Sequence, residues 1–234
     1  MLRDSIHLPS QPMLQKIILL DLNKELCSLW QKEIQRMSIA HPNNGIPFQV
    51  FNGTFDQLRL DSPTTIVSPG NSFASFGGGI DVAIRELLQT DPGSLEPSFE
   101  ECVAGALIKC NGYIPVQHLN NITFSHSTRG WRQLQCDTVV HIPTMRVPRH
   151  VYDGNEVHWK RFIFDIVWKA LNEIKTPNVI FPGLATGFGG LPVDLVAESM
   201  ISGMVLHQHQ GWNMKERGVH VLKYLAEDPS FLEL

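Results

Sequence analysis

The sequence has no hydrophobic run that could cross a membrane as a helix, which takes about 20 consecutive apolar residues. Its start, from Met1 to Pro12, also lacks the apolar core of a signal peptide. We therefore expect a soluble protein of the cytoplasm, with the nucleus as a second candidate location and no membrane partner.

Cysteine is scarce as well. Four cysteines are present, without a CxxC pair and without the spacing of a zinc site: Cys27, Cys102, Cys110 and Cys136. In an intracellular protein such cysteines are typically buried and reduced. We therefore predict no disulfide, no metal and no cofactor.

Positive charge is not in excess, since 19 Lys and Arg stand against 23 Asp and Glu, giving a net charge of −4. Proteins that follow a polymeric nucleic acid need clustered Lys and Arg, so this class of partner is disfavoured. A small anionic ligand stays open, because backbone N–H groups can bind it without net positive charge.

The length of 234 residues and the 43% hydrophobic content suit one substantial core. We expect a single domain over residues 1–234, with a flexible leader over 1–15. The sequence has no internal repeat and no linker long enough to separate two domains.

Short apolar runs alternate with segments of helical periodicity. The runs predict strands over 17–22, 48–51, 64–67, 139–142 and 179–181, a weak strand over 122–124 and a closing strand over 219–225. The periodic segments predict helices over 26–37, 80–88, 98–110, 159–170 and 193–204. This alternation indicates an α/β protein with a largely parallel sheet and helices on both faces, which binds ligands at the carboxyl ends of its strands.

Two glycine-rich segments follow predicted strands and precede predicted helices. The first contains Gly77, Gly78 and Gly79 directly before Ile80, and the second runs Thr186-Gly187-Phe188-Gly189-Gly190. Glycines let the backbone approach a ligand closely, and N–H groups at a helix start attract phosphate. Neither segment has the pattern of a Walker loop or of the dinucleotide-binding GxGxxG loop.

The paired glycine loops resemble those of the macrodomain family. In that family an "NAAN" segment and a GGG loop hold the distal ribose of ADP-ribose, and an "STGxxGxP" loop binds the diphosphate. Here Ser68-Pro-Gly-Asn71 and the residues from Ala185 to Pro192 stand at these places, and the resemblance covers about residues 48–204. It implies a three-layer α/β/α fold with a mixed, mostly parallel central sheet.

Three positions depart from the family pattern. Thr54 stands where an aspartate usually reads the adenine, Gly189 replaces an aromatic residue that packs on the distal ribose, and Ser68 replaces the first asparagine. Phe188 is a candidate substitute for the aromatic residue. The departures resemble a divergent branch of fungal macrodomain proteins with a phosphatase role on ADP-ribose 1″-phosphate.

Asp81 and Asn71 are the candidate catalytic residues. The resemblance implies that Asp81 orients or activates a water and that Asn71 bonds a ribose hydroxyl. The residues alone allow a helix-end role for Asp81 and an Asx-turn for Asn71. Because the helix start favours an ionised carboxylate, we expect a low pKa for Asp81, which would then position the water rather than deprotonate it.

Of five further residues, Asp21 and Trp131 have two interpretations each. Asp21 is either a substitute reader of the adenine or a cap for the following helix. His141, in a predicted strand, is expected to be a hydrogen-bonded core residue, and His207 and His209 are expected to lie in water. Trp131, in a polar excursion that could cover the site, is either a stacking platform for adenine or a hydrophobic anchor.

The function expected from this combination is a hydrolase on the 1″ position of an ADP-ribose derivative, with the 1″-phosphate as the first substrate. Alternatives are a mono-ADP-ribosyl or O-acetyl-ADP-ribose hydrolase, a non-enzymatic reader of ADP-ribose or an ADP-ribosylated protein, and a binder of another phosphorylated sugar or nucleotide.

Overall fold

A computed structural model describes residues 14–42, 45 and 47–232, so residues 1–13 of the expected leader lie outside the described residues. Six strands form one sheet in the order β2-β1-β6-β3-β5-β4. Their bounds are β1 (Lys16–Asp21), β2 (Phe48–Asn52), β3 (Thr64–Ser68), β4 (Asn120–Thr123), β5 (Cys136–His141) and β6 (Asn178–Phe181). Strand β4 runs antiparallel to β5, and the other neighbours are parallel.

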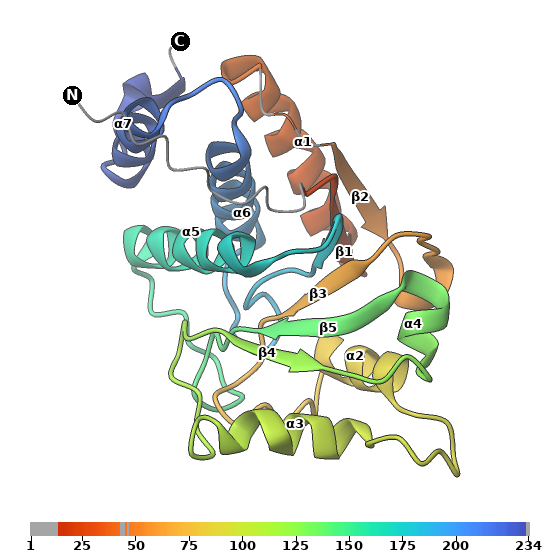
Figure 1. Cartoon of the computed structure of the whole chain (residues 1–234). Coiled ribbons are helices and arrows are strands. Elements are labelled where there is room, and N and C mark those ends of the chain that lie inside the picture. The colour runs from red at the N-terminus through yellow and green to blue at the C-terminus, as the bar shows by residue number, and fades with distance from the viewer. Residues whose placement is uncertain (1–13, 43–44, 46, 233–234) are drawn as a thin grey trace, which may run out of the picture.

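Helices cover both faces of the sheet (Figure 1). One face carries α1 (Lys24–Ala40), α5 (Glu156–Glu173) and α6 (Val193–Gln208), and the other carries α2 (Ile80–Leu88), α3 (Phe99–Ile108) and α4 (Arg129–Leu134). Helix α7 (Met214–Leu225) packs on α6, and two short 3-10 turns lie at Phe55–Gln57 and Pro229–Leu232. The predicted three-layer fold with a mixed, mostly parallel sheet is confirmed.

The continuous apolar strands are buried on both faces, as their sequences predict. In β1, Ile17 and Leu19 belong to the hydrophobic core under α1, α5 and α6, whereas Ile18 and Leu20 belong to the core on the opposite face. All four side chains are at most 2% exposed. The sheet is therefore packed between two hydrophobic cores, which hold the carboxyl ends of its strands, and the loops that follow them, in place.

The predicted closing strand over 219–225 is wrong, because these residues form the second half of α7. Asn213 caps this helix: its side chain accepts hydrogen bonds from the N–H groups of Lys215 and Glu216, and Glu216 bonds back to the N–H of Asn213. Such a capping box starts a helix firmly and outweighs the alternation of apolar residues further along.

The cysteines are free, two of them buried and two partly buried. In the part of the chain that the structure describes, no helix has the length and apolar character to cross a bilayer.

Candidate functional site

The two glycine-rich loops meet at the carboxyl edge of the sheet because the strands that precede them are neighbours. Strand β3 leads into the first loop and β6 into the second, and these strands pair in parallel. The ring of Phe188 lies against Gly78, where an added Cβ would be 2.5 Å from Cε2 of the ring. Phe188, which is 60% exposed, therefore bridges the two loops.

Both loops contain backbone that L side chains rarely adopt. Ala74 and Phe76 in the first loop have φ values of 46° and 43°, and Ala185 in the second has 58°. Each such residue costs on the order of 1–3 kcal/mol and persists only where the surroundings impose it. Gly79 has φ of 56° directly before α2, a backbone conformation that would be strained in a residue with a side chain.

Two pockets lie along these loops and share residues. The first, which we call the loop pocket, has a volume of about 210 Å³ and lies between the two glycine loops. The second, the edge pocket, has about 350 Å³ and lies over the ends of β1 and β6. Gly79, Ile80, Gly183 and Gly187 line both pockets, so the two form one continuous cleft.

The cleft brings together most of the residues selected from the sequence. The loop pocket is lined, among others, by Asn71, Gly77, Gly78, Asp81 and Phe188. The edge pocket adds Asp21, Thr54 and Thr186. Met145 and Pro148 also line the cleft, and the sequence analysis missed them because they belong to a loop without a ligand-binding pattern. Gly183, at the start of the second glycine loop, lines it as well.

Gly189 and Gly190 do not line either pocket. The carbonyl of Gly189 instead accepts a hydrogen bond from the N–H of Val151 at 3.0 Å, and the ring of His150 lies where a Cβ of Gly190 would be. These two glycines thus fasten the second loop to residues 150–151.

Asn71 forms the Asx-turn that was its alternative interpretation, since its Oδ1 accepts a hydrogen bond from the N–H of Phe73 at 3.0 Å. Its Nδ2 donates to Oγ of Ser75 at 2.7 Å. The side chain nevertheless lines the loop pocket and is 6% exposed. The loop-building role is therefore observed, and contact with a ligand stays a prediction.

Asp21 is not the cap of α1, because Asn23 takes that position, but its carboxylate holds both Asn23 and the second loop. Its Oδ1 accepts from the N–H of Asn23 at 2.9 Å, and its Oδ2 accepts from the N–H of Gly183 at 3.1 Å. A Cβ on Gly183 would lie 2.9 Å from the same Oδ2. The carboxylate therefore fixes the end of β1 to the floor of the cleft.

Asp81 lies in the first turn of α2 and lines the loop pocket with only 7% of its surface exposed. Burial raises the pKa of its carboxyl from 3.8 to about 6, although the hydrogen bond from Ser68 opposes this change. The predicted low pKa is wrong. Removal from water outweighs the stabilisation that the helix start gives to a negative charge.

Asp81, Ser68 and His141 form a buried hydrogen-bonded chain. Oγ of Ser68 lies 2.9 Å from Oδ1 of Asp81 and 2.9 Å from Nδ1 of His141, and Nε2 of His141 lies 3.0 Å from the carbonyl oxygen of Asn71. His141 and Ser68 are fully buried. Burial lowers the pKa of His141 to about 4, so its ring is neutral near pH 7.

The number of protons in this chain follows from its acceptors. The carbonyl of Asn71 can only accept, so Nε2 of the neutral His141 carries the proton and Nδ1 is an acceptor for the hydroxyl of Ser68. The hydroxyl of Ser68 has one proton for two acceptors, Oδ1 of Asp81 and Nδ1 of His141, so it donates to only one of them at a time.

Residues 59–227, which include both glycine loops, match the family model described as Macro-like domain. The chain belongs to this family. Among solved structures, the macrodomain of Mycobacterium tuberculosis DarG is similar at 16% identity and a TM-score of 0.46, covering 67% of this chain and 90% of that chain. A macrodomain mutant from Oceanobacillus iheyensis has 16% identity and a TM-score of 0.45, covering 72% of this chain and 88% of its own.

The structure of this macro-like domain also tests the predictions made for several residues outside the cleft. The ring of Trp131 stacks on His126 with centroids 3.5 Å apart, and it does not line either pocket of the cleft. His141 has the predicted hydrogen-bonded core position. The prediction that His207 and His209 lie in water is wrong, because burial lowers the pKa of both and His209 is only 4% exposed.

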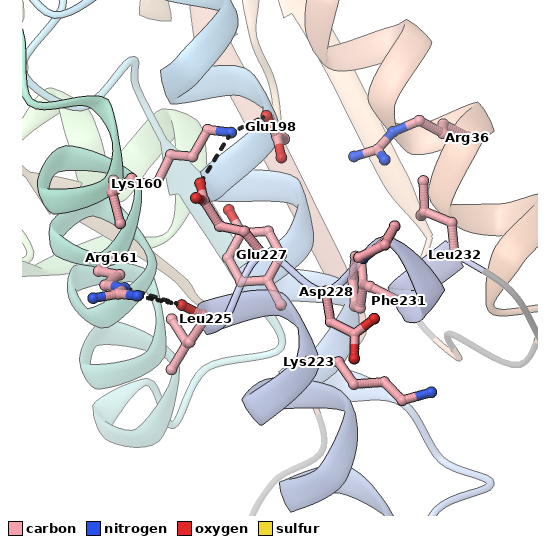
Figure 2. Close-up of a pocket in the computed structure, with 13 residues that line it drawn as sticks. Arg36, Lys160, Arg161, Glu198, Lys223, Leu225, Glu227, Asp228, Phe231 and Leu232 are labelled. Carbon is pink, nitrogen blue, oxygen red and sulfur yellow. Dashed lines mark hydrogen bonds and ion pairs between the residues drawn. The ribbon is translucent and has the colours of Figure 1, made fainter.

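The macro-like domain has another pocket among α1, α5, α6 and α7, with a volume of about 190 Å³ (Figure 2). Several of its charged groups already have partners. Nζ of Lys160 pairs with Glu198 at 3.2 Å and with Glu227 at 3.9 Å, and the guanidinium of Arg161 donates to the carbonyl of Leu225. None of its lining residues belongs to the glycine loops, so the cleft is the better candidate site.

Proposed function

We propose that this macro-like domain binds an ADP-ribose-type ligand along the cleft, with the distal ribose in the loop pocket and the diphosphate against the backbone of the second loop. The joined pockets support this pose, since they offer an extended cavity with a glycine backbone in the middle. The start of α2 has no side-chain cap, and N–H groups at a helix start favour a negatively charged ligand.

The edge pocket takes the adenine in this proposal. Its lining includes Thr54, Ile80 and, at the end of β1, Asp21. Both carboxylate oxygens of Asp21 already accept one backbone hydrogen bond, and each keeps a second lone pair for the exocyclic amine of adenine. Thr54 adds a smaller hydroxyl at the place of the usual aspartate.

We further propose that the domain hydrolyses a substituent at the 1″ position, with Asp81 as the acid and base. The observation that supports this step is a buried carboxyl in the loop pocket whose pKa is about 6. Such a group exchanges protons near neutral pH, as a general acid or base must.

With ADP-ribose 1″-phosphate, a water oxygen bonds to phosphorus while the bond from phosphorus to the 1″ oxygen breaks. Asp81 takes a proton from the water and gives one to the departing oxygen, so ADP-ribose and phosphate leave and Asp81 returns to its starting state. Backbone N–H groups of the loops stabilise the developing charge. Ser68 and His141 hold the carboxyl in place.

The 1″-phosphate, assigned by the resemblance to the fungal branch, is the first substrate to test. An acyl or protein substituent at the same position uses the same water and the same carboxyl. A pure reader would bind ADP-ribose and leave all these derivatives intact.

The test combines binding and turnover. Calorimetry with ADP-ribose, ribose 5-phosphate and AMP measures which parts of the ligand are required, and crystals soaked with ADP-ribose give its position. The same preparations are assayed on ADP-ribose 1″-phosphate, O-acetyl-ADP-ribose and glutamate-linked ADP-ribose. Binding of ADP-ribose in the cleft with turnover of one derivative supports the proposal. No binding, or a ligand seated outside the cleft, rejects it.

A further inference from the structure

A third cavity opens beside the loop pocket. It has a volume of about 510 Å³ and is lined by residues of the loop that follows β5 and by the start of α5. We call it the basic pocket and define it by Arg146, Arg149, His150 and His158. Met145 lines both this pocket and the loop pocket, so the two adjoin.

Every charged side chain that lines the basic pocket is positive. Arg146 and Arg149 are exposed, and among the described residues neither guanidinium has a carboxylate within ion-pairing distance. By contrast, Arg129 pairs with Asp56 and Arg132 with Asp91. The pocket therefore presents two arginines without an acidic partner in its lining.

The acid nearest in sequence, Asp153, interacts with His158 of the lining but forms an ion pair with neither arginine. Asp153 does not line the pocket, and its Oδ1 accepts hydrogen bonds from Nε1 of Trp159 at 2.9 Å and from the N–H of Asn155 at 3.0 Å. On another side, Gln117 lines the pocket and accepts a hydrogen bond from Nζ of Lys169, which adds a further positive charge close by.

The loop that carries the arginines is fastened to both glycine loops. The N–H of Ser72 donates to the carbonyls of Met145 and Arg146 at 3.0 and 3.2 Å. At the other end, the N–H of Val151 donates to the carbonyl of Gly189 at 3.0 Å. The backbone of both arginines thus has a defined place relative to the loop pocket, where we place the distal ribose.

We propose that the basic pocket binds a phosphate group of a ligand that continues beyond the distal ribose. Guanidinium groups bind phosphate oxygens in pairs of parallel hydrogen bonds, and the absence of carboxylates from the lining removes the usual competitor. The phosphate is either a terminal phosphomonoester at the 1″ position or the phosphate of an attached nucleotide unit. This inference rests on the proposed function, because only a distal ribose in the loop pocket places the next phosphate of the ligand at the basic pocket.

The test measures affinities of three ligands by calorimetry: ADP-ribose, ADP-ribose 1″-phosphate, and a dimer of ADP-ribose joined through the distal ribose. Turnover is suppressed with Asp81→Asn as the background. The full-length chain is compared with Arg146→Gln/Arg149→Gln and with Lys32→Gln/Lys215→Gln. The second variant removes the same charge from two exposed positions on α1 and α7.

The arginine variant should lose about tenfold in affinity for at least one phosphate-extended ligand and stay within about twofold for ADP-ribose. The lysine variant should keep all three affinities. The extended ligand that weakens identifies the phosphate source, and its advantage over ADP-ribose should shrink as salt rises.

An equal loss for ADP-ribose and both extended ligands, or no loss for any, overturns the inference while the proposed function stands. If the unsubstituted chain binds no ADP-ribose, the proposed function fails, and the inference fails with it.

Discussion

Oγ of Ser68 lies 2.9 Å from Oδ1 of Asp81, and this contact joins the end of β3 to the first turn of α2 beneath the loop pocket. Burial raises the pKa of the Asp81 carboxyl, and the hydrogen bond from Ser68 partly offsets this rise. Ser68 therefore acts on both the position and the acidity of the carboxyl.

Replacing Ser68 with Ala should slow hydrolysis about 10- to 100-fold, because Asp81 and His141 both lose their partner and the carboxyl is no longer fixed. The pH–rate profile should also shift, since the hydroxyl acts on the pKa of Asp81. Ser68→Cys, which keeps a small polar group, should recover part of the rate. An unchanged pH–rate profile in Ser68→Ala would show that the reactivity of Asp81 does not depend on its hydrogen bond with Ser68.

The hydrogen-bonded chain also predicts how stability depends on pH. The folded pKa of Asp81 is about 6 and above its ordinary value, so this group makes the free energy of unfolding fall as pH rises from 3.8 to 6. The folded pKa of His141 is about 4 and below its ordinary 6.5, so this group makes the free energy fall as pH falls from 6.5 to 4. In the native protein the two effects oppose each other.

Replacing one of the two residues should therefore leave the effect of the other on the pH dependence of the free energy of unfolding. In Asp81→Asn, the free energy of unfolding should rise by about 1–3 kcal/mol more than in the native protein between pH 4 and 6.5. In His141→Gln it should fall by a similar amount between pH 3.8 and 6. Urea titrations across this range measure both curves, and parallel curves for all three proteins would contradict the pKa assignments.

Gly78→Ala should weaken ligand binding, because its Cβ would lie 2.5 Å from the ring of Phe188. The ring would move and the two loops would separate. A double-mutant cycle with Phe188→Ala checks this cause, since the ring is then absent and the added methyl should cost little. If Gly78→Ala costs as much without the ring as with it, another contact is responsible.

His41→Phe should stabilise the domain by about 1–2 kcal/mol. His41 is fully buried, neither ring nitrogen has a hydrogen-bond partner in the described residues, and its ring packs near Trp212 and Phe231. Burial and the nearby His220, His209 and Arg36 lower its pKa to about 4. The gain should therefore grow as pH falls from 6.5 to 4, as denaturant titrations at pH 7 and pH 5 would measure.

Much of the fold could be predicted from the sequence because its signals are local. The runs in β1, β3 and β6 and the helical periodicity of α1, α2, α5 and α6 each belong to one segment. The strand predicted over 219–225 is wrong, because Val219 and Val221 fit a strand pattern as well as a helix. The capping box of Asn213 and Glu216 is the signal that decides for a helix.

The candidate site was less accessible to sequence reasoning. Ser68 and His141 are 73 positions apart, and they meet because β3 and β5 are neighbours, an order that no local pattern gives. The raised pKa of Asp81 could not be found either, because it depends on burial beneath the loops. Glycine spacing showed which loops line the cleft, and only tertiary packing shows which polar groups support them.

The most direct test is single-turnover hydrolysis of ADP-ribose 1″-phosphate by the native chain, Asp81→Asn and Asp194→Asn. Asp194 is a matched control, since it is also the second residue of a helix that follows a glycine loop, but it is exposed and does not line the cleft. The native chain and Asp194→Asn should release phosphate at equal rates, and Asp81→Asn should be slower by about 100-fold or more while still binding ADP-ribose. Equal rates for all three proteins, or no phosphate from the native chain, would contradict the proposed chemistry.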